Sequence, residues 1–230
     1  MNTKFLITAD SNRSALLKKK IIHYYIANGD ATIAELCKEM DLSIPTVTKL
    51  VGELLDDGYI LDFGKQETNG GRKPNIYGLN PVSGYFVGVD VFRSKINIAA
   101  VDFKGDKLRI EENIPYSLEN TPEALEMLCN LINDFIDRLS VPREKVLAVG
   151  VNISGRVNPV SGYSYSIFYF EEKPLSQILE ERIKIKIYIE NDTRAMMYGE
   201  YMQGVVKGEK NILFINMGWG LGLSIFINGE

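Results

Sequence analysis

The sequence has 230 residues, of which 45% are hydrophobic and 24% charged, and its formal net charge is -4. This composition is typical of a folded globular protein, and it excludes both intrinsic disorder and a surface coated in nucleic-acid-binding charge, though not a local basic face. No apolar run reaches the roughly 18 residues that span a bilayer, and the N-terminus lacks a signal-peptide core, so we expect a cytoplasmic protein with no membrane partner.

The chain has two cysteines, Cys37 and Cys129, and one histidine, His23. Each cysteine falls on the apolar side of a helical pattern, which predicts a buried free thiol at both positions. Neither cysteine has the spacing of a metal ligand. We therefore expect neither a metal site nor a Cys-His catalytic pair in this chain.

Three helices are predicted in the first 60 residues. Residues 14–28 carry apolar side chains at helical spacing. The second helix opens at Thr32, an N-cap residue whose capping-box partner is Glu35. The third opens at Ser43, whose side chain is expected to cap it, and has Pro45 in its first turn. Its predicted buried residues are Val47, Leu50, Val51, Leu54 and Leu55.

Two short helices joined by a tight turn, with the second amphipathic, follow the helix-turn-helix plan. In this plan the helix that opens at Ser43 is the second of the pair, and its outward face carries Ser43, Thr46, Thr48 and Lys49. Short hydroxyls and a cation near a helix N-terminus suit base edges and phosphates in a major groove. These four residues are therefore candidate DNA contacts.

A hairpin is predicted after the third helix, from strands at 59–61 and 75–79. The segment between them is Gly-rich and carries the cations Lys65, Arg72 and Lys73. Such a basic hairpin is what a DNA-contacting wing requires, so residues 1–80 predict a winged helix-turn-helix domain. A small helical domain with a polar hairpin that binds no DNA is the alternative. The run of lysines at 18–20 is open to two interpretations, a phosphate-facing patch or a solvated helix face.

From residue 81 the pattern changes to strands and helices in alternation. The predicted strands are 85–91, 95–102, 110–116, 146–152, 185–189, 211–217 and 223–227, and the predicted helices are 121–139, 175–183 and 193–203. Three strands followed by alternating helix and strand indicate an α/β domain with a mixed sheet over residues 81–230.

Five short motifs follow the winged helix in order. They are Gly88-Val89-Asp90, Val149-Gly150-Val151, Ser154-Gly155, Glu190-Asn191-Asp192 and Gly218-Trp219-Gly220-Leu221-Gly222. Their order and spacing resemble the ROK family of repressors, uncharacterised reading frames and sugar kinases. The resemblance implies an actin/hexokinase-like (ribonuclease H-like) fold that is incomplete at the C-terminus, since in the family most of a second lobe and a zinc motif follow the position of Glu230. We expect the last strands to leave an exposed edge.

The loops that hold nucleotide phosphates in the family's kinases are altered here. The first kinase motif is Asp-x-Gly-Gly-Thr, and Phe92 stands where it has a glycine, so a bulky side chain fills the space and restricts the turn. In the second motif Trp219 replaces a small hydroxyl residue. We therefore expect no nucleotide cofactor, no catalytic residues and no kinase activity.

The sugar loop of the family is better preserved. Asp192 matches the aspartate that accepts the proton of the sugar hydroxyl in the kinases, and Asn191 matches a sugar-contacting residue. The resemblance makes these two residues, with Ser154 and Gly155, candidate effector contacts. In the alternative interpretation, Asn191 and Asp192 only cap the helix that follows.

The sequence therefore predicts a sugar-responsive transcriptional regulator, with a repressor favoured, that binds operator DNA and a sugar or sugar-phosphate effector. Winged-helix regulators usually act on two-fold sites, so we expect a homodimer or a higher even oligomer. One alternative is a ROK sugar kinase with an appended DNA-binding domain. The other is a regulator whose effector is a protein.

Overall fold

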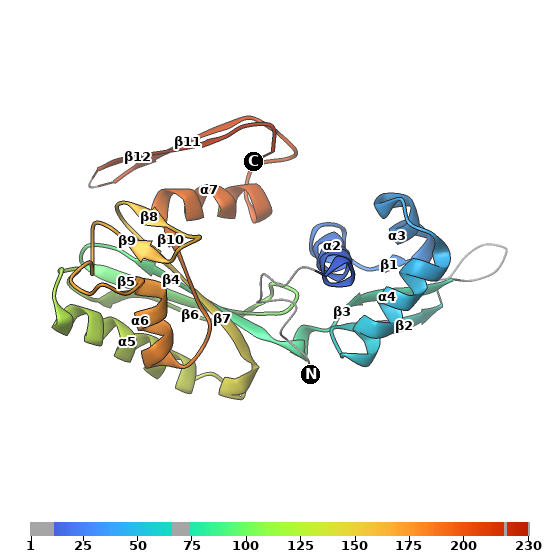
Figure 1. Cartoon of the computed structure of the whole chain (residues 1–230), viewed down its shortest axis with the longest axis horizontal. Helices are drawn as coiled ribbons and strands as arrows, with labels where there is room; N and C mark the ends of the chain where they lie inside the picture. The colour runs from blue at the N-terminus through green and yellow to red at the C-terminus, as the bar shows by residue number, and fades with distance from the viewer. Residues whose placement is uncertain (1–11, 66–73, 219, 230) are drawn as a thin grey trace. The chain divides into compact units, whose positions relative to one another are not determined.

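The computed structural model describes residues 12–65, 74–218 and 220–229 (Figure 1). The chain forms two compact units. The first comprises residues 1–85 together with 101–108, and the second comprises residues 86–100 together with 109–230. None of the described helices has the length and apolar character needed to cross a membrane.

The first unit contains the predicted helices and the predicted strand pair. Its elements are α2 (Arg13–Asn28), β1 (Ala31–Thr32), α3 (Ile33–Met40), α4 (Ile44–Asp56), β2 (Ile60–Lys65), β3 (Asn75–Leu79) and the 3-10 turn η1 (Pro81–Ser83). The strands form an antiparallel sheet in the order β1-β3-β2. The strand β1, which was not predicted, has only two residues, too few for a period-2 pattern to be visible in the sequence.

The starts of α3 and α4 differ in how they are capped. At α3 the predicted capping box is confirmed, because Glu35 N–H donates to Thr32 Oγ1 at 3.3 Å and Thr32 N–H donates to Glu35 Oε2 at 2.7 Å. At α4 the residue Ser43 occupies the N-cap position, but its hydroxyl lies 2.9 Å from the Thr46 hydroxyl and makes no cap hydrogen bond. The predicted side-chain cap at Ser43 is therefore wrong, because the two hydroxyls pair with each other instead.

The core of the first unit lies between the helices α2, α3 and α4 and the sheet. Its buried residues include Ile21, Ile22, Tyr25, Leu36, Val47, Leu50, Val51, Leu54 and Tyr59. Leu55, predicted to be buried, is half-buried. Cys37 is also only half-buried, so the prediction of a buried thiol is wrong there, and it is confirmed at Cys129.

Lys18 joins α2 to α4 through ion pairs. Its Nζ lies 2.7 Å from Glu53 Oε2 and 3.7 Å from Asp57 Oδ2, and only 14% of its side chain is exposed. A cation that is already paired and largely covered does not serve as a phosphate contact. The phosphate-patch interpretation of the lysine run is therefore wrong for Lys18.

The segment 101–108 belongs to the first unit. Phe103 is buried, its ring centroid lies 5.6 Å from that of Tyr59, and its N–H donates to Pro81 O at 3.2 Å. Lys104 Nζ lies 3.9 Å from Asp30 Oδ1. The hairpin tip between β5 and β6 therefore packs in the compact unit that contains the helix-turn-helix.

The second unit is built on a five-stranded sheet in the order β10-β7-β4-β5-β6. Its elements are β4 (Tyr85–Val91), β5 (Lys95–Asp102), β6 (Lys107–Pro115), α5 (Pro122–Asp137), η2 (Arg143–Lys145), β7 (Val146–Ile153), β8 (Val157–Asn158), β9 (Tyr163–Ser164), α6 (Leu175–Ile183), β10 (Ile187–Asn191), α7 (Asp192–Gln203), β11 (Ile212–Met217) and β12 (Leu221–Phe226). All seven predicted strands and three predicted helices of this region are present. The short pair β8 and β9 was not predicted, and β10 begins two residues later than predicted.

Helices cover the sheet on both faces (Figure 1). The helices α5 and α6 pack against each other on one face, and α7 lies on the other, where it also contacts β11 and β12. The α5 side chains Leu125, Leu128 and Ile132 are fully buried, as are Val89 and Val149 of the central strands. This is the mixed α/β architecture expected from the sequence.

The hairpin of β11 and β12 has one covered face and one open face. On the covered face Phe226 is buried, with its ring centroid 4.7 Å from that of Tyr201 on α7. The open face exposes Leu213, Ile215, Met217, Leu221, Leu223 and Ile225. Among the described strands neither pairs with any other, so the expected exposed edge is present.

The capping box of α3 gives a pH-dependent stability prediction. Glu35→Ala removes the carboxylate that accepts the Thr32 N–H, and we expect it to lower the free energy of unfolding by roughly 0.5–1 kcal/mol at pH 7. Hydrogen bonds from Thr32 lower the pKa of the Glu35 carboxyl. The stabilisation is therefore present above the unfolded pKa of about 4.3 and is lost as the pH falls through the lower folded pKa.

Urea denaturation of Glu35→Ala and wild type at several pH values measures this difference. Glu39→Ala, at an exposed position of the same helix, is the matched control and should lie within about 0.5 kcal/mol of wild type throughout. A difference that is the same at pH 7 and at pH 3 would contradict a role for the charged carboxylate.

Candidate functional site

The N-terminal turns of α4 present an exposed polar face. Thr46, Thr48 and Lys49 are exposed, because Val47 and Leu50 turn into the core between them. Ser43 is exposed as well. The Lys49 side chain is 78% exposed, and its Nζ lies 3.9 Å from Glu53 Oε1, a distance that leaves its charge available to a phosphate.

The hairpin that follows α4 begins with a fixed bend. Asp62 Oδ1 accepts from Gly64 N–H at 2.8 Å, and its Oδ2 accepts from Asn75 Nδ2 at 2.7 Å. Lys65 is exposed at the end of β2. Of the other predicted wing contacts, Arg72 and Lys73 lie outside the described residues.

A cavity of about 820 Å³ lies within the second unit. All four predicted effector residues line it, namely Ser154, Gly155, Asn191 and Asp192. Parallel pairing of β10 with β7 in the register Asn191↔Ile153 brings these residues together, since both strands end at the same edge of the sheet. The volume is within the range of about 300–1,000 Å³ that small-molecule sites occupy.

Asn191 is both a helix cap and a cavity residue. Its Oδ1 accepts from Arg194 N–H at 3.1 Å, which is the N-cap hydrogen bond of α7. Its Nδ2 donates to Gly155 O at 3.0 Å and to Asp192 Oδ1 at 2.9 Å. The capping interpretation is therefore confirmed for Asn191, and the same bonds hold its amide at the wall of the cavity.

Asp192 is the first residue of α7. Its Oδ1 accepts from Thr193 N–H at 2.7 Å and from Thr193 Oγ1 at 3.3 Å. Within the part of the chain that the structure describes, every hydrogen bond of this carboxylate falls on Oδ1. Oδ2 therefore keeps its acceptor capacity for a ligand hydroxyl.

Gly155 allows the loop after β7 to turn beside the cavity. Its φ is +93°, a conformation that side chains disfavour, and a Cβ added there would collide with the Ser166 side chain. Ser166 Oγ in turn accepts from Arg156 N–H at 2.9 Å. The sequence did not single out Ser166 as a support for this loop, because the contact joins segments ten residues apart.

Phe92 lines the cavity at the turn between β4 and β5. Its N–H donates to Lys95 O at 2.9 Å, and Lys95 Nζ lies 5.4 Å from its ring centroid. Asp90, on the preceding strand, accepts from Asn152 Nδ2 at 2.6 Å. Trp219, of the second nucleotide motif, lies outside the described residues.

The cavity wall includes residues that the sequence did not identify as site residues. They are Arg93, Ser94, Lys95 and Asn216, among others. Arg93 and Ser94 form the centre of the β4–β5 turn, which the Phe92 N–H closes on Lys95 O. Two cations three and five residues after Asp90 were the signal that could have identified them. Among the described residues there is no group of His, Cys, Asp and Glu side chains that could hold a metal ion.

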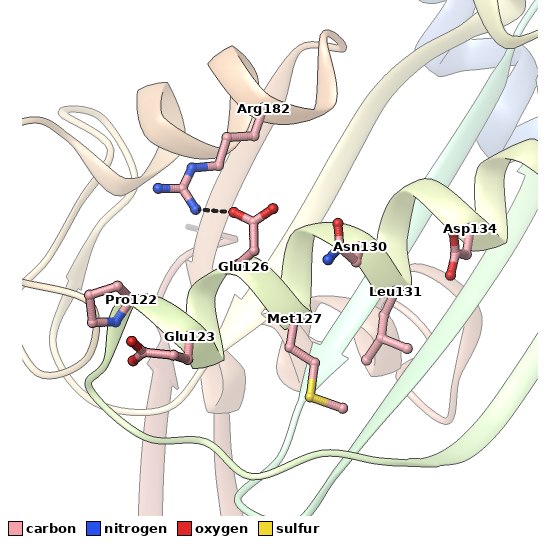
Figure 2. Close-up of a pocket in the computed structure, with 8 residues that line it drawn as sticks. All are labelled: Pro122, Glu123, Glu126, Met127, Asn130, Leu131, Asp134 and Arg182. Atoms are coloured by element: carbon pink, nitrogen blue, oxygen red, sulfur yellow. Dashed lines mark hydrogen bonds and ion pairs between the residues drawn. The ribbon is translucent and has the colours of Figure 1, made fainter.

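A second, shallower hollow lies on the outer surface of α5 (Figure 2). The Glu126 carboxylate on its wall pairs with Arg182 of α6 at 2.8 Å, and Met127 and Leu131 add an apolar side. None of the predicted site residues lines it. The 820 Å³ cavity is therefore the better candidate for a ligand site.

Comparison with known proteins gives two family matches. Residues 16–60 match the winged helix-turn-helix DNA-binding family, and residues 86–230 match the ROK family. The xylose repressor of Bacillus subtilis is 25% identical over 219 residues, which cover 93% of this chain and 56% of the repressor. The chain spans about half the length of the curated relatives it matches.

Solved structures of ROK family proteins also have folds similar to that of this chain. A ROK family transcriptional regulator, described as a homologue of the Escherichia coli MLC protein, superposes with a TM-score of 0.71 at 21% identity, over 93% of this chain and 55% of that one. A ROK family glucokinase from Streptomyces griseus, solved with glucose and AMPPNP, gives a TM-score of 0.53 at 26% identity, over 64% of this chain and 46% of that one.

The first unit thus has the fold of a winged helix-turn-helix, and the second has that of a sugar-kinase-like α/β domain. The chain belongs to the ROK family. The combination with an N-terminal winged helix is shared with the regulator structure, which matches nearly the whole chain, whereas the glucokinase matches about two thirds of it.

The loop at Gly155 gives a prediction for the site. Gly155→Ala should lower the free energy of unfolding by about 1–3 kcal/mol, since the added Cβ is strained at this φ and meets Ser166. Gly88→Ala, where a Cβ meets nothing within 4 Å, is the control and should stay within about 0.5 kcal/mol of wild type. Equal stability of both variants by thermal denaturation would show that the loop is not packed as described.

Proposed function

We propose that this protein is a transcriptional regulator that binds operator DNA through its winged helix and responds to a sugar or sugar phosphate bound in the ROK-domain cavity. The observation that carries the proposal is that Asn191 and Asp192 stand together with Ser154 and Gly155 on one cavity wall, while Phe92 occupies the neighbouring turn. The relative from Bacillus subtilis is named a xylose repressor, which supports repression as the mode of action.

DNA contact is assigned to the exposed face of α4 and to the wing. Thr46, Thr48 and Lys49 offer two hydroxyls and a cation on the exposed face of α4, near its N-terminal end. This is the part of a recognition helix that meets base edges. Ser43, Lys65, Arg72 and Lys73 complete the proposed set. We further propose a homodimer or higher even oligomer, since two-fold operators are read by two-fold proteins.

Sugar sensing is assigned to the α7 end of the cavity. The free acceptor capacity of Asp192 Oδ2 and the positioned amide of Asn191 suit a pair of adjacent hydroxyls. Sugar kinases use the same fold, so a kinase with an appended DNA-binding domain is the competing function. Phe92 argues against it, because its side chain occupies the turn at which nucleotide phosphates need open backbone.

DNA binding through α4 predicts a salt-dependent effect of one cation. Lys49→Ala should weaken binding to a selected operator and reduce the slope of log affinity against log salt by about 0.9, the value of one phosphate contact. Lys107→Ala, an exposed lysine at the edge of the 101–108 segment, is the control and should leave the slope unchanged. Failure of the intact protein to enrich any sequence from a random duplex pool would refute the DNA-binding assignment.

Absence of kinase activity is predicted from the altered turn at Phe92. The intact protein, incubated with labelled ATP and a panel of hexoses, should transfer no phosphoryl group above background. Asp192→Ala is the control, since transfer that this variant abolishes would come from the site itself. Such transfer would favour the competing kinase function.

Sensing through Asp192 is tested by a substitution that conserves shape. Asp192→Asn keeps the Oδ1 acceptor for Thr193 and removes the charge. We expect operator affinity near that of wild type, together with a reduced response to the effector, whose full effect on operator affinity should be about 5- to 150-fold. Asp134→Asn, exposed on α5, is the control. An unchanged response in Asp192→Asn, measured by titration of an operator complex, would mean that Asp192 serves the helix only.

A further inference from the structure

We propose that the effector is a sugar that carries an anionic group, a phosphate or a carboxylate, and that Arg93, Ser94 and Lys95 bind this group. The inference rests on the proposed sugar-sensing function and specifies its ligand. It assigns a binding role to the β4–β5 turn, which lines the same cavity as Asn191 and Asp192.

The charges on the cavity wall favour an anion. Of the described charged residues that line the cavity, Arg93 and Lys95 are cationic, and Asp192 is the one acidic residue. A neutral sugar would make use of Asp192 and leave the two cations without a role in binding. A sugar with a negative group uses both parts of the wall.

The β4–β5 turn presents its cations from a rigid base. The Phe92 N–H closes the turn on Lys95 O at 2.9 Å, so Arg93 and Ser94 lie at its tip, where both are exposed. Lys95 is held by Asn113, whose Oδ1 accepts from its Nζ at 2.6 Å, and by the ring of Phe92. These partners are neutral and leave the Lys95 charge to act on a ligand.

The chemistry of the three side chains suits an oxyanion. The guanidinium of an arginine binds the oxygens of a phosphate or carboxylate in pairs, a lysine adds a point charge, and a serine hydroxyl donates one further hydrogen bond. Phe92 is compatible with this smaller group, because its ring lies 5.4 Å from Lys95 Nζ and holds that cation at the turn.

The start of α7 is a poorer place for the anion. Its amides are already used, because Thr193 N–H donates to Asp192 and Arg194 N–H donates to Asn191. The Asp192 carboxylate would also repel a negative group brought close to it. The hydroxyls of the ligand therefore go to Asn191 and Asp192, and its charge goes to the β4–β5 turn.

Matched pairs of sugars test the inference. Thermal shift and titration calorimetry on the intact protein should compare glucose, mannose, xylose and N-acetylglucosamine with their phosphorylated forms, together with gluconate and glucuronate. We expect a phosphorylated or acidic member to bind at least tenfold more tightly than its neutral partner. Gluconate and glucuronate separate a carboxylate from a phosphate as the group that is recognised.

Substitutions locate the selectivity. Arg93→Gln should remove most of the preference for the charged member while leaving the affinity for the neutral one unchanged, and Arg93→Lys should restore part of it. Lys145→Gln, an exposed lysine of the same unit away from the cavity, should behave as wild type.

The outcomes separate this inference from the proposed function. Equal or tighter binding of neutral sugars would overturn the inference and leave sugar sensing intact. A preference for charged sugars that survives in Arg93→Gln would do the same. Binding of ADP without any phosphorylated or acidic sugar would overturn the inference in favour of a nucleotide site. Binding of no sugar in the panel, together with an operator complex that no sugar releases, would count against both.

Discussion

The junction between β10 and α7 is the constraint on which the candidate site depends. Parallel pairing of β10 with β7 places Asn191 opposite Ile153, so the loop after β7 and the start of α7 lie at one edge of the sheet. Asn191 then joins them, since its amide caps α7 and also donates to Gly155 O. Because one side chain fixes both the helix and the loop, the geometry of the cavity wall follows from the packing of the sheet.

This arrangement explains why a cap and a ligand contact need not compete. The helix cap uses Oδ1 of Asn191, and the hydrogen bonds that Asp192 accepts within the chain use Oδ1 of Asp192. The hydrogen bonds that stabilise the start of α7 therefore leave Oδ2 of Asp192 as an acceptor. The remaining acceptor is held in place by the same bonds. A site built from partly used capping groups is preorganised, which lowers the ordering cost of binding.

Most of the fold could be predicted from the sequence because its elements are long and periodic. The helices α2, α5 and α6 and the strands β4, β5 and β7 carry patterns of at least seven residues, long enough for the apolar period to identify them. The two-residue strands β1, β8 and β9 could not be predicted, because nothing periodic exists at that length. The Ser43 cap was predicted wrongly because its competitor, the Thr46 hydroxyl, is visible only when the turn is folded.

The candidate site was predictable at its α7 end and not at the β4–β5 turn. Asn191 and Asp192 sit in a motif, whereas the departure from the first kinase motif pointed to Phe92 and not to Arg93, Ser94 or Lys95. Their common cavity brings together residues about a hundred positions apart, which no local pattern encodes.

The two halves of the cavity have a consequence for signalling. A ligand shifts an equilibrium only by the difference in its affinity for the two states, so a sensor gains from contacts on separate elements whose spacing can change. The β4–β5 turn and the start of α7 are separate elements on the wall of one cavity, since one belongs to a hairpin and the other to a helix end. The β4–β5 turn begins strand β5, whose far end leads into the 101–108 segment of the first unit, where Phe103 is buried against Tyr59. The backbone of β5 therefore runs without a break from the Arg93 turn into the unit that carries the helix-turn-helix.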